Sequence, residues 1–496
     1  MHRRDPESLV QTHLELLEEE LDARFSLPWL LPSPIERRRV VFVDHEDVAL
    51  GGGQLLVSAV LGLDLALIVV ACAGHPFQRP ENSHIYEVFL PVDLTADEGL
   101  PARIADAVRS YTHTVDGIFT FNELMHVPTA KAAELLSVPT SPVSAYMICT
   151  DKYATRTFVD KEDPSFQAMR FFGRDELHAR VQSDDISLRY PLIVKPTKGC
   201  GSEGVNKVNN VTELYEAADR IAAGPTNKLG QTLVVETFID GPEFDANIVL
   251  CDSEVLFFEF ADDFPSAGDS DIASISAGFL ETSVFTPSNL PEAEVELVRS
   301  SLHPILLKLG FCWGVFHIDG RIRNPTMHYT MEDGILDLRQ RAVKSPNKPS
   351  FFLIEINARA ANLWVSSMVA HTYGIDYVGL HALCALRDTD RLKALCRPFK
   401  FPGGKQYWSE LVFIAPERGG VCTSDDACAE LEQRCPDLKA HIVKSVTLYK
   451  RGDSVPDPAT GELDFIACFV VYSRVSRLQA RQMAEKVRRE FRFEIV

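Results

Sequence analysis

The segment PLIVKPTKGCGSEGVNKVNN, residues 191–210, decides the fold of this chain. Its glycines Gly199, Gly201 and Gly204 spell G-x-G-x-x-G, a pattern that occurs in several unrelated phosphate-binding folds. The apolar run before the glycines predicts a buried strand, and VNKVNN after them alternates as a second strand would. The segment is therefore predicted to fold as a strand, a glycine-rich loop and a second strand.

The elements around this loop separate three interpretations. A dinucleotide-binding fingerprint needs a helix directly after the glycines, whereas here the helix signal starts at Asn210, with Glu213 completing a capping-box pattern, and ends near Gly224. A protein kinase carries its lysine after the loop and needs H-R-D and D-F-G tripeptides, which this sequence lacks. The third interpretation is a hairpin that closes over the phosphates of ATP, with Lys195 and Ser202 as polar partners. An ordinary glycine-rich hairpin with a surface lysine is the alternative.

The segment LVVETFIDGPEFDANIVL, residues 233–250, carries a second nucleotide-binding signal. An apolar strand reaches Glu236, a turn follows at Gly241, and Glu243 comes directly after the turn region. The edge of such a strand offers backbone N–H and C=O groups to an adenine, and a carboxylate seven residues later can hold ribose hydroxyls. The segment therefore favours the ATP-binding interpretation of the neighbouring loop.

Two later strands carry acids on one face each. WGVFHIDGRIR places His317 and Asp319 two residues apart, and FFLIEINARAANLW does the same for Glu355 and Asn357. Acids in apolar strands are costly unless they are paired or bound to metal, and oxygen ligands suit Mg²⁺. The other interpretation is a set of buried ion pairs with nearby arginines, namely Arg321, Arg323 and Arg359.

The part of the chain before residue 150 has a different sequence pattern. From residue 39, short apolar strands alternate with helix patterns, which predicts a doubly wound parallel sheet. The glycine turn at 51–53 lacks the dinucleotide spacing and is interpreted as a scaffold turn. Residues 7–26 predict an amphipathic helix, which either packs on its own chain or forms a homodimer.

Composition limits the classes of partner. The chain has 496 residues, which suggests about three packed units, and 50 Lys and Arg against 70 Asp and Glu give a net charge of −20. A body this acidic repels nucleic acid and anionic membranes. Eleven cysteines without C-x-x-C spacing are typical of a reduced compartment, and no apolar run is long enough to span a bilayer. We therefore expect a soluble, cytoplasmic protein.

Taken together, these motifs resemble the ATP-grasp superfamily of carboxylate–amine ligases over about residues 36–450, and most nearly its L-amino-acid ligase and carnosine-synthase-like branch. CTDKYATR is similar to the family's first lysine segment and YGIDYVGLHALCAL to the helix after its last motif. The nucleotide-binding residues that the resemblance implies are Lys152, with Arg156 beside it, Lys195, Gly199, Gly201, Ser202, Gly204, Glu236, Phe238 and Glu243. The implied metal ligands are Asp319, Glu355 and Asn357, and the implied catalytic residues are Arg359 and Lys195.

The resemblance also implies the architecture, which is a mixture of α/β and α+β domains with ATP held between two α+β subdomains. The expected divisions are an N-terminal helical extension (1–35), a Rossmann-like domain (36–150), a small ATP-grasp subdomain with the glycine-rich loop (151–230), a large subdomain with the metal site (231–395) and a C-terminal α+β subdomain (396–496).

The activity implied is ATP-dependent formation of an amide from a small carboxylic acid and an amine or amino acid. ATP and two Mg²⁺ ions, or Mn²⁺ in their place, would serve an acyl-phosphate route that releases ADP and phosphate. Two alternatives stay open: a carboxylase or nucleotide-pathway ligase with another acceptor, and an ATP-binding protein without turnover.

Several residues near the last motif extend this expectation. Arg359 lies two residues past Asn357, so on a continuing strand it points into the same cavity. His317 and Trp364 are candidates for contact with the substrates, although each is also typical of a core position. The sequence departs from the family in having Asp319 where glutamate is usual, and in a polar insert at residues 324–350 that is expected to form a flexible flap.

Overall fold

The computed structural model describes Leu14 and residues 36–45, 53–159, 166–183, 185–199, 201–224, 232–270, 277–343, 345–401, 404–458 and 464–496. The predicted N-terminal helix at 7–26 lies outside the described residues except for Leu14, and the glycine turn at 51–53 does so except for Gly53. No helix in the described ranges combines the length and the apolar character that a bilayer span requires.

The first sheet is fully parallel, as the alternating pattern predicts. Its strand order is β3-β2-β1-β4, and the strands are β1 Arg39–Val43, β2 Ala66–Ala71, β3 Val88–Pro91 and β4 Gly117–Phe119. Helix α2 (Gly53–Gly62) covers one face, where Val40 and Phe42 are buried, and α3 (Leu100–Arg109) covers the other, where Val41 is buried. The doubly wound arrangement expected here is confirmed.

Three helices lead to a second sheet, which also has four strands. The helices are α4 His126–Leu136, α5 Val143–Cys149 and α6 Lys152–Val159. The sheet is antiparallel with order β5-β8-β6-β7, built from β5 Ala168–Phe172, β6 Leu192–Pro196, β7 Asn206–Val208 and β8 Thr232–Thr237. Helices α7 (Arg174–Gln182) and α8 (Val211–Ala223) pack on it.

The glycine-rich segment folds as the sequence predicts. Strands β6 and β7 pair antiparallel on either side of the loop, so the segment is strand, loop and strand. Asn210 caps α8 by accepting a hydrogen bond from the Glu213 backbone N–H, and the helix ends at Gly224. The predicted capping box is only partly present, because the Glu213 carboxylate accepts from the backbone N–H of Asn209.

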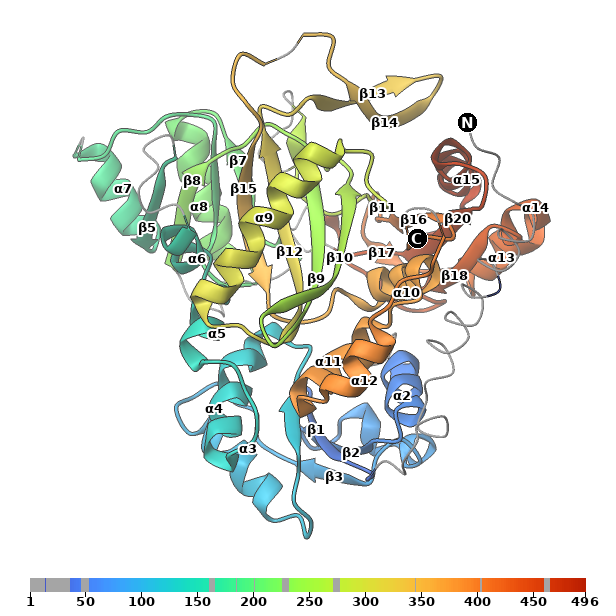
Figure 1. The fold of residues 1–496 in the computed structure, drawn as a ribbon. Coiled ribbons are helices and arrows are strands. Elements are labelled where there is room, and N and C mark those ends of the chain that lie inside the picture. Colours follow the sequence, from blue (N-terminus) through green and yellow to red (C-terminus); the bar gives the residue numbers. More distant parts are fainter. Residues whose placement is uncertain are drawn as a thin grey trace, which may run out of the picture.

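The third sheet has eight strands and forms the centre of the molecule (Figure 1). Its order is β15-β12-β9-β10-β11-β16-β20-β18, with all neighbours antiparallel. The strands are β9 Glu243–Cys251, β10 Glu254–Asp263, β11 Ser283–Thr286, β12 Gly314–Arg323, β15 Ser350–Asn357, β16 Trp408–Ile414, β18 Ile442–Thr447 and β20 Ala467–Ser473. Strands from the expected C-terminal subdomain thus continue the sheet that carries the metal-site motifs.

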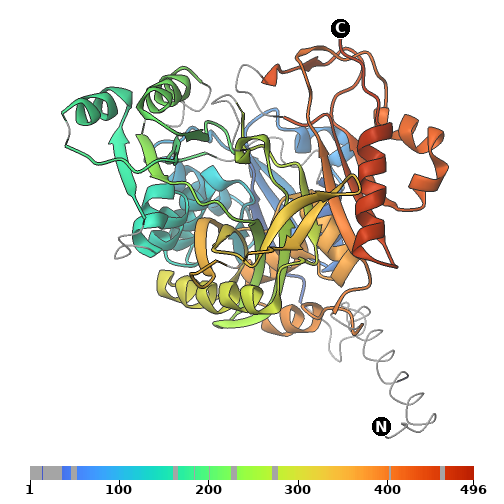
Figure 2. The same ribbon diagram turned by 90° about the horizontal axis from the view of Figure 1, so that it is seen from above.

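The remaining helices cover this sheet and join it to the N-terminal domain. They are α9 Glu292–Leu309, α10 Leu363–Tyr373, α11 Tyr377–Leu386, α12 Thr389–Leu395, α13 Ala427–Arg434, α14 Pro436–Lys439 and α15 Arg477–Glu490. Helix α11 contacts α2, β4 and β12, so it bridges the first and third sheets, and α15 packs against β16 and β20 (Figure 2). A short two-stranded sheet pairs β17 (Gly420–Val421) with β19 (Ser454–Val455).

The insert at 324–350 forms a docked hairpin, which corrects the expectation of a flexible flap. Strands β13 (Met327–Glu332) and β14 (Ile335–Gln340) pair antiparallel around a turn at Asp333 and Gly334. The Tyr329 hydroxyl donates to the Asp263 carbonyl, and Asp337 pairs with Arg477 of α15 at 2.7 Å. These contacts fasten the hairpin to the body of the protein.

One buried acid in the central sheet has a consequence for stability. Glu259 of β10 is 2% exposed and accepts hydrogen bonds from Asn247 and Thr286. Burial raises the pKa of Glu259 to about 7, because the loss of hydration outweighs these two hydrogen bonds. Between pH 4.5, the ordinary pKa of this side chain, and about pH 7, the Glu259 carboxyl is therefore protonated in the folded protein but ionised in the unfolded chain.

We expect Glu259→Gln to raise the free energy of unfolding above pH 7. In the unaltered protein the contribution of Glu259 to that free energy falls as pH rises from about 4.5 to 7, because unfolding releases a proton in this range. A pKa difference of this size between the folded and unfolded states corresponds to roughly 3 kcal/mol. Urea unfolding at pH 5 and pH 8 should show a weaker pH dependence for the variant. Glu254→Gln, at the exposed end of the same strand, is the control, and equal pH dependence of both variants would contradict the assignment.

Candidate active site

An open cavity of about 1010 Å³ lies between the small antiparallel sheet and the central sheet. The glycine-rich loop forms one wall, and β12 and β15 contribute to the opposite wall. The predicted site residues that line it are Lys152, Lys195, Gly199, Gly201, Ser202, Glu236, Phe238, Glu243, Asp319 and Glu355. Segments that are far apart in sequence, such as those of Lys152 and Glu355, therefore meet around one space.

The glycine-rich loop has the backbone that its sequence requires. Gly199, Gly201 and Gly204 have φ values of 122°, 62° and 71°, which side-chain-bearing residues rarely adopt. Ser202 shares this region at 57°. A Cβ at Gly201 would meet open space, so it is the conformation and not crowding that favours glycine there. Gly204 supports the turn but does not line the cavity.

Lys195 belongs to a buried charged triad. Its Nζ lies 2.5 Å from Oε1 of Glu236, while Nε of Arg156 lies 3.1 Å from Oε2. Burial raises the pKa of Glu236, but Lys195 and Arg156 outweigh that effect and hold it below its ordinary value. Arg156 is 3% exposed and lies 3.8 Å from the centre of the Phe352 ring, which places it behind the cavity as a support for Glu236.

Lys152 stands at the meeting point of three elements. It opens α6, its Nζ donates to the Gly199 carbonyl at 2.5 Å, and the same atom lies 3.4 Å from Oε2 of Glu355 on β15. One ammonium thus connects the glycine-rich loop to the opposite wall. Together with Lys195 it supplies the positive charge that a polyphosphate requires.

Glu243, the predicted ribose ligand, is held by an arginine. The Arg321 guanidinium donates to its Oε2 at 2.5 Å and to Asp269 at 2.6 Å. Arg321 also lies over the Phe238 ring at 5.3 Å, so it shapes the wall near the predicted adenine segment. The Arg321 guanidinium is therefore paired with Glu243 and Asp269. This pairing disfavours the interpretation that Arg321 neutralises the charge of Asp319 or Glu355.

The predicted metal ligands converge. Asp319 and Glu355 are directly paired across β12 and β15, and Nδ2 of Asn357 lies 3.4 Å from Oδ2 of Asp319 and 3.3 Å from Oε1 of Glu355. Burial raises the pKa of Glu355, but Lys152 and other donors outweigh it and lower that pKa to about 2. The two adjacent carboxylates are oxygen donors of the kind that Mg²⁺ takes, so they fit a magnesium site. Asn357 turns its Nδ2 toward them and its Oδ1 toward Arg359, so its amide would have to turn over to add a third oxygen.

Arg359 corrects one expectation from the sequence. Strand β15 ends at Asn357, so Arg359 lies in the following turn and not on a continuing strand. Its guanidinium still turns back to the site, with one terminal nitrogen 3.5 Å from Oδ1 of Asn357 and the other 3.0 Å from the Ala360 carbonyl. It does not line the nucleotide cavity itself.

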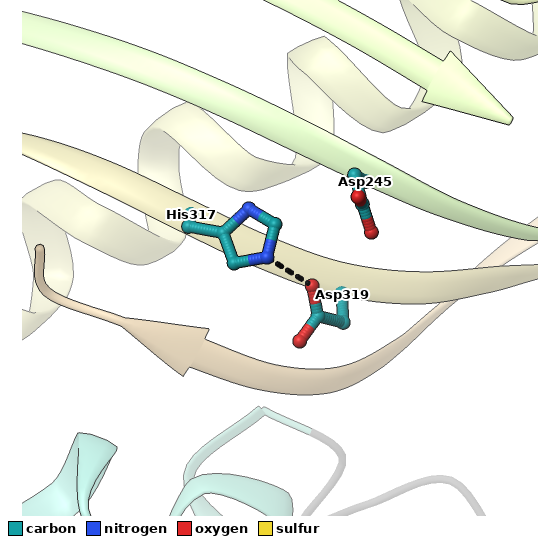
Figure 3. A group of neighbouring side chains, drawn as sticks. All are labelled: Asp245, His317 and Asp319. Atoms are coloured by element: carbon teal, nitrogen blue, oxygen red, sulfur yellow. Dashed lines mark ion pairs between the residues drawn. The ribbon is translucent and has the colours of Figure 1, made fainter. Parts of the chain in front are cut away.

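The two substrate candidates fare differently. His317 lies beside the metal residues, with its Nε2 3.2 Å from Oδ1 of Asp319 (Figure 3), and burial lowers its pKa to about 3, so the ring is neutral near pH 7. Trp364 is the second residue of α10, packs against the core, and has the Lys444 ammonium 5.0 Å from the centre of its ring. Neither His317 nor Trp364 lines the nucleotide cavity.

The sequence analysis did not single out several acids of the site. Glu123 follows β4, and burial together with the Glu355 carboxylate raises its pKa, against the opposing influence of Arg359 and Lys152. Its position at the carboxyl end of a parallel strand, where ligands commonly bind, was the available signal. Asp245, Asp263 and Glu281 also line the cavity, and of these Asp245 stands in the segment 233–250, two residues after Glu243.

Two family models match the chain. One described as an ATP-grasp domain covers residues 188–333, and one described as an ATP-grasp N-terminal domain covers residues 59–140. These ranges contain the glycine-rich loop with Glu236, Glu243 and Asp319, and most of the parallel sheet.

Relatives match over much greater lengths. The ATP-grasp enzyme fsqD of Aspergillus fumigatus is 35% identical over 492 residues, which is 97% of this chain and 84% of that protein. Carnosine synthase 1 of Homo sapiens is 23% identical over 364 residues, or 68% of this chain, and the match spans 40% of that longer protein.

Solved structures share the fold. The L-amino acid ligase from Bacillus licheniformis aligns with a TM-score of 0.68 at 21% sequence identity, covering 93% of this chain and 99% of that one. The phosphoribosylglycinamide synthetase from Anaerococcus prevotii aligns with a TM-score of 0.60 at 15% identity.

Proposed function

This chain belongs to the ATP-grasp family, and we propose that it joins a small carboxylic acid to an amine or amino acid at the cavity described above. It is an ATP-dependent ligase that forms amide bonds. The observation that carries the assignment of the site is the convergence of Lys152, Lys195 and Glu355 on one cavity, with Arg359 beside Asn357 at its edge.

ATP is proposed to lie with its phosphates under the glycine-rich loop. Backbone N–H groups of the loop and the ammonium groups of Lys152 and Lys195 would bind the phosphate oxygens. Glu236 holds Lys195 in place at 2.5 Å, so the lysine is positioned before the nucleotide arrives. Thr237 and Phe238 would offer the adenine its backbone edge and one face, and Glu243 would bind the ribose.

Asp319, Glu355 and Asn357 would hold the magnesium that neutralises charge on the transferred phosphoryl group. The substrate carboxylate is a poor acyl donor because its leaving group would be oxide. Attack of a carboxylate oxygen on the γ-phosphorus gives an acyl phosphate and ADP, and the phosphate is then a good leaving group. In such transfers the protein acts mainly through positioning and charge neutralisation.

The second step uses residues at the edge of the cavity. The amine attacks the acyl carbon, an oxyanion forms, and phosphate leaves to give the amide. The Arg359 guanidinium is proposed to hold the acyl phosphate and then the oxyanion. Glu123, whose pKa is influenced by Arg359 and Lys152, is proposed to bind the amine in its ammonium form; the ammonium loses one proton to solvent before the neutral amine attacks, and the nitrogen loses a second proton as phosphate leaves.

Phosphate release in a matrix of acids and amines tests this function. We expect release that depends on both partners together and an amide of matching mass in the same reaction. Release with bicarbonate as the only acid would instead support the carboxylase alternative. ATP binding without turnover in any combination would support the inactive alternative.

Glu355→Gln is expected to leave the fold intact and to lower magnesium-dependent turnover by about 10–100-fold or more. An amide oxygen carries no charge for the metal, and the ion pair with Lys152 is lost at the same time. Turnover measured against Mg²⁺ concentration, with circular dichroism on the same samples, checks this. Glu296→Gln, on the exposed face of α9, is the control; normal turnover of Glu355→Gln would remove this residue from the metal site.

A further inference from the structure

Three neighbouring strands of the central sheet place a row of carboxylates across one face. Asp245 on β9 pairs directly with Asp319 on β12, and Asp319 pairs with Glu355 on β15. Like charges directly opposite one another on adjacent strands repel. Lys152 lies 3.4 Å from Glu355 at one end of the row, whereas Asp245 at the other end is 5% exposed and has no hydrogen bond from a basic side chain in the described ranges.

The next pair of residues on the same face of these strands orients the His317 side chain toward the row of carboxylates. Asn247 donates its Nδ2 to Glu259 at 2.6 Å, so its Oδ1 is left as an acceptor for Nδ1 of His317 at 3.0 Å. The His317 ring then carries its proton on Nδ1, and the lone pair on its Nε2 points away from Asn247. That lone pair faces Oδ1 of Asp319 at 3.2 Å, an oxygen that has no hydrogen-bond donor among the described residues.

The ligand atoms of Asp245, His317 and Asp319 all lie within 4.8 Å of one another (Figure 3). His317 is 8% exposed, so its acceptor nitrogen is turned away from bulk water and toward two carboxylates. Three acceptors that face one another in a buried space repel unless a proton or a metal cation lies between them. A histidine whose other nitrogen is fixed by a hydrogen bond is the usual arrangement in metal sites.

The two oxygens of Asp319 face different groups. Its Oδ2 lies beside Asn357, on the side of the magnesium residues described above, while its Oδ1 lies beside His317. Asp319 can therefore serve one cation with each oxygen. The ligand set on the Oδ1 side contains an imidazole, which favours first-row transition metals over Mg²⁺.

We propose that Asp245, His317 and Asp319 bind a divalent transition-metal ion such as Mn²⁺ in the absence of nucleotide. This site adds two side chains, Asp245 and His317, to the residues assigned to the ATP-bound magnesium. It does not depend on the proposed ligation, because binding is measured without ATP or substrates. Three protein ligands leave further positions for water or a substrate oxygen.

The test uses the full chain, stripped of metal with a chelator and titrated with Mn²⁺ alone. Electron paramagnetic resonance counts bound Mn²⁺, and spin-echo modulation detects a directly bound imidazole nitrogen. We expect one Mn²⁺ per chain with nitrogen modulation, displaced by Co²⁺ or Zn²⁺ at concentrations where Mg²⁺ has little effect. Asp245→Asn and His317→Gln should each weaken binding about tenfold or more, and His317→Gln should abolish the nitrogen signal.

Asp263→Asn is the matched control, since Asp263 lines the same cavity and undergoes the same change from acid to amide but lies outside the three-residue group. It should bind Mn²⁺ as the unaltered protein does. Mn²⁺ binding that requires ATP, that lacks the nitrogen signal, or that is equal in Asp245→Asn and Asp263→Asn would overturn the proposal while leaving the ligase function intact. Two independent variants guard against misfolding of either, and thermal melts with and without Mn²⁺ report folding.

Discussion

Replacing Arg359 by alanine is expected to lower the rate of amide formation by about 10²–10³-fold with little change in nucleotide affinity. The guanidinium lies beside Asn357 and outside the lining of the nucleotide cavity. Its proposed partners, the acyl phosphate and the oxyanion, exist only during the reaction. Loss of one preorganised donor to such a charge therefore acts on the chemical step and leaves ATP binding nearly unchanged.

Arg359→Lys provides the sharper comparison. A lysine keeps the charge but cannot span two oxygens as the planar guanidinium does, so we expect it to rescue the rate poorly. Nucleotide titration and amide formation should be measured on the same preparation of each variant. A large loss of ATP affinity with a proportionate loss of rate would mean that Arg359 serves the nucleotide or the fold, and the second step would need another stabilising group.

Lys195→Ala is expected to weaken ATP binding and to abolish turnover. A charge-assisted contact to phosphate contributes about 1.5–3 kcal/mol, which corresponds to about a 10- to 150-fold increase in the Kd for ATP. The loss of rate should exceed this, since charge on the transferred phosphoryl group is also left unbalanced. Calorimetric titration of ATP and measurement of phosphate release check the two effects separately.

Lys195 also forms a buried ion pair, so Lys195→Ala removes more than the contact with phosphate. Removing the ammonium leaves Glu236 buried beside Arg156 alone, so some loss of stability is expected as well. Lys405→Ala, which changes a half-buried lysine near Trp408 and outside the cavity, is the control. Unchanged ATP affinity and rate in a folded Lys195→Ala protein would remove Lys195 from the site.

Local sequence patterns were sufficient to predict the elements of the site. The order of strand, glycine-rich loop and strand around Gly199, and the i, i+2 spacing of Glu355 and Asn357, depend only on neighbouring residues. The parallel N-terminal sheet followed from the alternation of strands and helices. The divisions between subdomains stay predictions, as do the N-terminal helix and its role in a homodimer.

Contacts between distant segments could not be predicted in the same way. Arg321 meets Glu243 because β12 and β9 pair in one particular register, and Arg156 meets Glu236 across eighty residues of sequence. Glu123 and Asp245 join the site only through the packing of domains and strands. The hairpin at 327–340 is different, since its Asp-Gly turn at Asp333 between alternating residues was a visible signal that the expectation of a flap overlooked.

The most direct test of the central claim follows the oxygen of the acid substrate. An acid and amine pair found active by phosphate release is supplied with ¹⁸O in the carboxylate, and the products are analysed by mass spectrometry. The acyl-phosphate route predicts ADP, the amide, and phosphate that carries one ¹⁸O from the carboxylate. Unlabelled phosphate, or AMP and pyrophosphate in place of ADP and phosphate, would contradict the account.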